Sequence, residues 1–176
     1  MTLDTARAPS QNDLWALLTN HYGLISLAIE AKAGESFDAT VNDWLDKDES
    51  RKGREARLEW LCQELNRPAA LEVCGLLRYQ LFHRTVSALK EAKRYRASAA
   101  VMLVQSFSED PAAWADFERY AAFLGAVAKK GALSLVPGGG GLLIYLGWVQ
   151  SACVTDARMT AIDGPQPVEA FSMAEG

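Results

Sequence analysis

The stretch PSQNDLWALLTNHYGLISLAIEAK, residues 9–32, contains two short apolar segments separated by the residues HYG at 21–23. In the second segment, isoleucine or leucine at every odd position from 25 to 29 alternates with smaller or polar residues. That period of two is typical of a β-strand, whereas the first segment, 12–19, fits a strand or a helix by pattern alone. Because the turn between them ends in Gly23, we expect the two segments to form a β-hairpin.

Three charged residues stand at the ends of this hairpin. Glu30 and Lys32 are two residues apart, so in a strand their side chains point to the same face. If the hairpin closes near residue 21, Asp13 pairs with residue 29 or 30 of the second strand. The spacing therefore predicts that Asp13, Glu30 and Lys32 form one cluster.

Two carboxylates a few Å apart repel each other and favour a bound cation. A hard divalent ion such as Mg²⁺, or Mn²⁺ in its place, suits the oxygen ligands of Asp13 and Glu30. The ammonium of Lys32 would then orient a water molecule or stabilise negative charge on a phosphate. This cluster predicts metal-assisted hydrolysis of phosphodiesters. Alternatively, the three charges form a solvated ion pair at a sheet edge, which would contribute little to stability.

The rest of the chain alternates helical and extended patterns. Helices are expected at 38–45 with Asp38 as the cap, at 54–65, at 75–96, and from Pro111 to about residue 129. The apolar run 98–107 reads as a central strand buried on both faces, PGGGG at 137–141 as a loop, and 142–152 as a last strand. We therefore expect an α/β or α+β fold with a mixed sheet and flanking helices. We expect a single domain over 1–155 and a weakly structured tail over 156–176.

An aspartate, a hairpin and then Glu-x-Lys resemble the PD-(D/E)xK nuclease superfamily, here as Asp13 and EAK at 30–32. The resemblance implies a restriction-endonuclease-like core in which Asp13 and Glu30 bind Mg²⁺ or Mn²⁺ and Lys32 is catalytic. Some branches carry a glutamine on the following helix, and Gln80 matches that position. Only twelve residues precede Asp13, so we expect the superfamily's first helix to be lacking. The chain also resembles uncharacterised bacterial proteins that share SQNDL, ExK and LRYQLxHRTxSA segments.

The segment LRYQLFHRT, 77–85, is the second group of polar residues. On a helix, Gln80, His83 and Arg84 share a face. Residues 76–98 hold six basic residues and one acidic residue, within a chain of net charge −4. Arg78, His83 and Arg84 are therefore candidate contacts for a nucleic-acid phosphate. The alternative is a helix with a solvated basic end and a buried, hydrogen-bonded His83.

Composition limits the remaining choices. The chain has 176 residues, 49% of them hydrophobic, and no apolar run long enough to span a membrane. The first residues contain no apolar core of a secretory signal, and the three cysteines form no CxxC pair, so we expect reduced thiols in a cytoplasmic protein. We expect nucleic acid as the partner, no membrane contact, and a homodimer. The alternative function is a catalytically inactive nuclease fold that acts as an oligomeric binding module.

Overall fold

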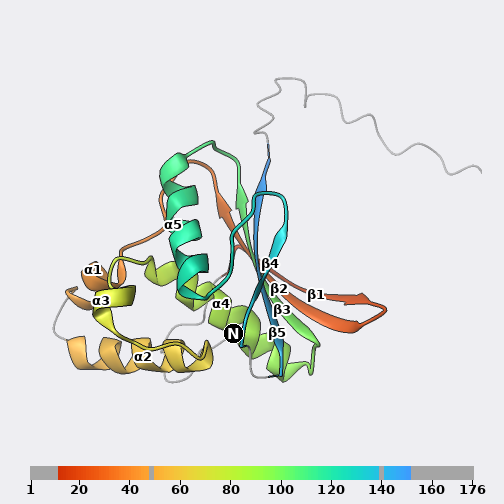
Figure 1. Cartoon of the computed structure of the whole chain (residues 1–176), viewed down its shortest axis with the longest axis horizontal. Coiled ribbons are helices and arrows are strands. Elements are labelled where there is room, and N and C mark those ends of the chain that lie inside the picture. The colour runs from red at the N-terminus through yellow and green to blue at the C-terminus, as the bar shows by residue number, and fades with distance from the viewer. Residues whose placement is uncertain (1–11, 48–49, 139–140, 152–176) are drawn as a thin grey trace, which may run out of the picture.

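The structure, a computed structural model, describes residues 12–47, 50–138 and 141–151, and these form one sheet with helices beside it (Figure 1). The strands are β1 (Leu14–Asn20), β2 (Gly23–Lys32), β3 (Ala99–Ser106), β4 (Leu133–Val136) and β5 (Leu143–Gln150). The helices are α1 (Val41–Leu45), α2 (Arg51–Glu64), α3 (Leu71–Cys74), α4 (Tyr79–Arg94) and α5 (Pro111–Phe123). The predicted α/β class is confirmed, while the domain boundary at 155 and the tail 156–176 lie outside the described residues.

The sheet is mixed, with the strand order β1-β2-β3-β5-β4. β1 pairs antiparallel with β2, and β4 pairs antiparallel with β5, whereas β2, β3 and β5 are parallel to one another. The carboxyl ends of the three parallel strands therefore meet at one edge, where Lys32 pairs with Ser106 and Ser106 pairs with Gln150. In open α/β sheets this edge is where ligands bind.

The expected hairpin is present, and its register confirms the predicted pairing. Asn20 Oδ1 accepts a hydrogen bond of 2.8 Å from the backbone N–H of Tyr22, and Gly23 has a φ of +122°, which favours glycine. Leu14 pairs with Ile29, so the residue before β1, Asp13, stands opposite Glu30.

The described helices lie on one side of the sheet, with α1, α2 and α3 beyond α4 (Figure 1). α4 packs against β2 and β3, and Leu81, Phe82, Val86 and Leu89 on its inner face are fully buried. α5 reaches the same face of the sheet, because its Phe117 ring lies 5.3 Å from the Trp148 ring of β5. Cys62 and Cys74 are buried free thiols, as expected, and Cys153 lies outside the described residues. No helix in the described ranges is long and apolar enough to cross a membrane.

The helix expected over 75–96 begins only at Tyr79, as α4, because residues 75–78 form a turn and a bridge instead of the first helical turn. The backbone N–H of Val41 donates to Leu77 O over 2.8 Å, and Thr40 forms a bridge with Arg78. Residues 75–78 therefore pair with the chain before α1 instead of continuing a helix. The predicted cap of α1 is also wrong, because the Thr40 side chain, and not that of Asp38, accepts from the N–H of Asp43.

The helix expected to reach residue 129 ends at Phe123. Gly125 adopts a φ of +72°, which stops the helical path. The Arg67 side chain donates to the carbonyl oxygens of Phe123 and Leu124, so the end of α5 is held by an arginine from the loop after α2. A fifth strand that the sequence did not predict, β4, follows this turn.

Candidate functional site

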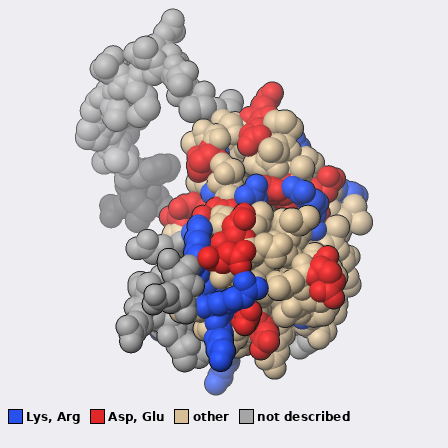
Figure 2. Space-filling view, turned by 90° about the vertical axis from the view of Figure 1, so that its left-hand side faces the viewer, with Lys and Arg blue, Asp and Glu red and all other residues tan. Residues whose placement is uncertain are grey.

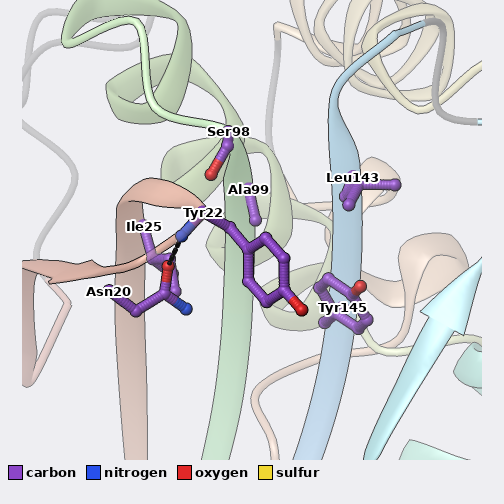
Figure 3. Close-up of a pocket in the computed structure, with 7 residues that line it drawn as sticks. All are labelled: Asn20, Tyr22, Ile25, Ser98, Ala99, Leu143 and Tyr145. Carbon is purple, nitrogen blue, oxygen red and sulfur yellow. Dashed lines mark hydrogen bonds between the residues drawn. The ribbon is translucent and has the colours of Figure 1, made fainter.

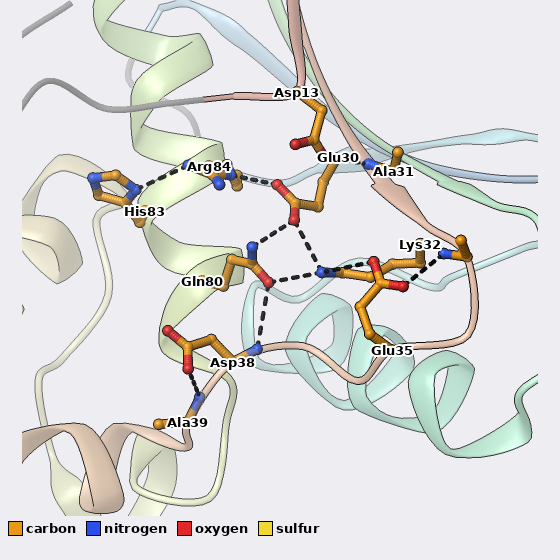
Figure 4. Close-up of polar contacts among 11 residues, drawn as sticks. Asp13, Glu30, Ala31, Lys32, Glu35, Asp38, Ala39, Gln80, His83 and Arg84 are labelled. Carbon is orange, nitrogen blue, oxygen red and sulfur yellow. Dashed lines mark hydrogen bonds and ion pairs between the residues drawn. The ribbon is translucent and has the colours of Figure 1, made fainter.

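The three charges of the hairpin lie on one face, at the carboxyl end of β2. Register places Asp13, Trp15 and Leu17 on the same face as Glu30 and the other even residues of β2. This is the face that α4 covers, because Gln80 and Arg84 of α4 contact Glu30 (Figure 4). The hairpin and α4 together build the site.

Asp13 is the exposed member of the cluster. Its Oδ2 accepts a hydrogen bond of 2.7 Å from the backbone N–H of Ala31, the residue between Glu30 and Lys32. Asp13 therefore links the residue before β1 to the end of β2. Its side chain lies beside that of Glu30 (Figure 4).

Glu30 is buried, with 3% of its surface exposed, and both of its oxygens are bound. Its Oε1 lies 3.0 Å from Lys32 Nζ and accepts a hydrogen bond of 2.5 Å from Gln80 Nε2. Its Oε2 accepts a hydrogen bond of 2.5 Å from Arg84 Nε. One carboxylate thus faces two cations, and that arrangement satisfies the buried charge.

Lys32 is buried as well, with 6% of its side chain exposed. Its Nζ donates to Gln80 Oε1 over 3.1 Å and lies 5.1 Å from the centre of the Phe37 ring. Gln80 bridges the site, because its amide nitrogen binds Glu30 while its amide oxygen binds Lys32. The structure brings Glu30, Lys32 and Gln80 into direct contact, and Asp13 lies next to them through its hydrogen bond from the Ala31 N–H.

Glu35 is a site residue that the sequence reasoning missed. Its Oε1 lies 3.9 Å from Lys32 Nζ, and its Oε2 accepts a hydrogen bond of 3.0 Å from the Ala33 N–H. Its own backbone N–H, that of Ala33 and the charge of Lys32 lower the pKa of Glu35. The sequence feature that could have identified it is a second glutamate three residues after Lys32, in the loop that follows β2 next to the site.

Arg84 and Arg78, both predicted to contact substrate, occupy different places. Arg84 belongs to the core of the site as the partner of Glu30. Arg78 Nε donates to Asp116 Oδ2 over 2.6 Å, and its Nη1 donates to Asp38 O over 3.2 Å. Arg78 thereby joins the start of α4 to α5, and any phosphate contact would compete with the buried carboxylate of Asp116.

The basic segment 76–98 is largely neutralised by ion pairs. Five of its six basic residues lie within 4.0 Å of a carboxylate, namely Arg78, Arg84, Lys90, Lys93 and Arg94. Figure 2 shows Lys and Arg interleaved with Asp and Glu on the helical side of the molecule. The predicted phosphate-contacting face is therefore not a continuous basic surface on this side.

His83 lies next to the site and is held neutral. Its Nδ1 is 3.5 Å from Arg84 Nη1, and its ring stacks at 6.0 Å on that of Tyr79. Burial, with help from the charges of Arg57 and Arg84, lowers the pKa of His83 to about 4. Trp44 stacks on Tyr79 at 3.8 Å, and Arg57 Nε donates to the Tyr79 hydroxyl over 2.7 Å. The sequence did not predict this aromatic and basic neighbourhood.

The lowered pKa of His83 predicts a loss of stability in acid. The unfolded chain binds a proton at His83 near pH 6.5, whereas the folded chain resists it until about pH 4. Stability is therefore lost as the pH falls from about 6.5 to 4, by about 2.5 kcal/mol at about pH 4.5. Urea unfolding near pH 7.5 and pH 4.5 measures this loss. Between these two pH values, His83→Phe should lose about 2.5 kcal/mol less stability than the unmodified chain. Equal losses of stability in the two chains would contradict this role of His83.

Residues 1–153 match a family described as Domain of unknown function (DUF6946), and the chain belongs to this family. Searches of curated proteins and of solved structures found no significant match.

Proposed function

We propose that this member of DUF6946 hydrolyses phosphodiester bonds of nucleic acid, with the help of a divalent metal, at a PD-(D/E)xK-type site. The observation that carries the proposal is the network of Glu30, Lys32 and Gln80 at the end of the hairpin, with Asp13 held beside it by a hydrogen bond from the backbone N–H of Ala31. The restriction-endonuclease-like core is part of the proposal. It is supported by the order of a hairpin, a helix bearing Gln80, and a strand parallel to β2.

The donors at the site fit Mg²⁺ or Mn²⁺ in kind, because the oxygens of Asp13 and Glu30 are hard ligands. In the described ranges, no group of three His, Cys, Asp or Glu side chains is placed to hold a metal ion. The metal would therefore be held by two protein carboxylates, with water and substrate completing its shell. Gln80 and Lys32 already bind Oε1 of Glu30, whereas Oε2 accepts only from Arg84 and keeps a lone pair that a metal could use.

When bound, such an ion would act as a Lewis acid on the phosphate and lower the pKa of a bound water. In the proposed hydrolysis a water molecule would add to phosphorus while a P–O bond breaks, the leaving oxygen would take up a proton, and negative charge would build on the phosphate oxygens. Lys32 Nζ carries the positive charge nearest to Glu30 Oε1 and would stabilise that negative charge. Gln80 orients the ammonium through its amide oxygen, and Arg84 holds Glu30 in place from the other side.

The test is cleavage of single- and double-stranded DNA and RNA by purified protein with Mn²⁺. The chain should cut at least one of these substrates, and chelation of the metal should stop the reaction. Asp13→Asn should lower the rate about 100-fold or more, because the variant keeps the hydrogen-bonding shape but loses the charge. Asp43→Asn, which alters an exposed carboxylate of α1, is the matched control and should keep the rate. If no substrate is cut with Mn²⁺, the enzymatic proposal fails.

The saturation of Glu30 favours a second candidate function. A carboxylate whose oxygens already bind a lysine, an arginine and an amide is satisfied without a metal. On this second reading the protein is an inactive nuclease fold that serves as a binding module. Calorimetry separates the two, since a folded protein that binds no Mn²⁺ supports the module, and binding lost in Asp13→Asn supports the enzyme.

A further inference from the structure

One whole face of the sheet is covered by no helix of the described residues. Register assigns to this face the odd residues of β2, β3, β4 and β5 and the even residues of β1. We name it the open face. Its positions are Leu14, Ala16, Leu18, Asn20, Gly23, Ile25, Leu27, Ile29, Ala31, Ala99, Val101, Leu103, Gln105, Leu133, Leu135, Leu143, Tyr145, Gly147 and Val149.

The open face is apolar and carries no charge. Six of its side chains are exposed large hydrophobic residues, Leu14, Leu18, Leu133, Leu135, Leu143 and Val149, with exposures from 37% to 54%. Its polar side chains are those of Asn20, Gln105 and Tyr145. Soluble monomers rarely leave a contiguous apolar surface of this kind in water, so the face marks an interaction site.

A shallow depression of about 320 Å³ lies at the turn end of the open face. Ile25, Ala99, Leu143 and Tyr145 line it from the strands, and Tyr22 stands over it (Figure 3). The Tyr22 side chain is 78% exposed, although tyrosine is among the residues that interfaces bury preferentially. The depression gives an apolar partner a place to insert side chains.

The candidate site, and Asn12 before β1, lie on the helix-covered side of the sheet, opposite the open face. Glu30 and Lys32 face α4, and Asn12, which precedes β1, donates from Nδ2 to Ser87 Oγ of α4 over 2.9 Å. A partner on the open face would therefore leave the site uncovered.

We infer that the open face binds the open face of a second copy of this chain, so that the two sheets form a sandwich. Strands of these lengths, at spacings of about 4.8 Å and a rise of about 3.3 Å per residue, cover about 600 Å². Two such faces bury about 1,200 Å², the lower end of the range for stable interfaces. Twisted sheets pack face to face in this way through interdigitating apolar side chains.

The chemistry of the face selects this occupant over others. A face without cations does not attract nucleic acid, whose binding depends on Lys and Arg contacts to phosphate. A twofold axis pairs the same surface with itself, and an uncharged apolar face is self-complementary because no like charges meet. The inference is independent of the proposed hydrolysis, since it uses none of the site residues.

The test is sedimentation velocity of the full chain at roughly 1 to 100 µM, with folding checked by circular dichroism. The expected species has twice the chain mass of 19.2 kDa. Leu135→Lys and Leu143→Lys, at positions about half exposed, should each weaken the dimer about 100-fold or more, because each buries two unpaired charges across the axis. Leu76→Lys, at a 71% exposed position off the open face, is the control and should leave the dimer intact.

A chain that is monomeric over the whole range would overturn the inference. A dimer that persists unchanged in both Leu135→Lys and Leu143→Lys would overturn it as well, because the contact would then lie elsewhere.

Discussion

Lys32→Met is expected to lower the rate of Mn²⁺-dependent cleavage about 100-fold or more, measured under conditions where the variant is folded. Methionine keeps most of the side chain that packs near Phe37 and removes only the ammonium. The loss follows because Lys32 Nζ supplies positive charge beside Glu30 in a buried site, where removing one such group typically costs two to three powers of ten, about 2.7–4 kcal/mol. Single-turnover cleavage with excess enzyme measures it.

The control for Lys32→Met is Lys93→Met. Lys93 is half exposed and pairs with Glu64 at 2.6 Å, far along α4 from Gln80, so the rate should stay within about twofold. Gln80→Leu adds a second check, because it frees Lys32 from its amide partner without removing its charge. An intermediate loss is expected there. A Lys32→Met enzyme that cuts at the full rate would show that the reaction, if present, happens elsewhere.

Glu30→Gln is expected to lower the free energy of unfolding by about 3 kcal/mol, since breaking a buried ion pair leaves charge without a partner. The amide has almost the same shape as the carboxylate, so packing is kept, but Arg84 and Lys32 then face a neutral group. Urea unfolding with an unchanged slope measures the difference.

Two further variants show whether this loss comes from the ion pairs. Glu64→Gln removes a carboxylate that pairs with the half-exposed Lys93, and its loss should be about 0.5 kcal/mol. Adding Arg84→Met to Glu30→Gln removes one of the two stranded cations and should recover part of the loss. If Glu30→Gln is as stable as the unmodified chain, the network is not what holds α4 to β2.

The hairpin and its register could be predicted from sequence because they depend on local signals. Alternating side chains from residue 25 to 29 define the second strand, and a glycine defines the turn. The pairing of the two strands then follows from the number of residues on each side of the turn. Asp13, Glu30 and Lys32 lie within this local unit, so their proximity followed as well. Gln80 was predicted only through the resemblance, since nothing in its own segment points toward the hairpin.

What the sequence did not reveal depends on contacts between distant segments. Arg84 and Arg78 both sit in a basic stretch, yet Arg84 binds Glu30 and Arg78 binds Asp116, 38 residues further along. Helix α4 begins at Tyr79 and not at residue 75 because residues 75–78 pair with residues 39–42, and helical propensity gives no sign of this pairing. The same is true of β4, whose alternation is only four residues long and depends on β5 for its pairing.

The most direct measurement is anomalous scattering from crystals soaked in Mn²⁺. The account predicts a manganese peak between the carboxylates of Asp13 and Glu30. A crystal that shows no peak there, with Glu30 still bound by all three side chains at high Mn²⁺, would contradict a metal site at this hairpin.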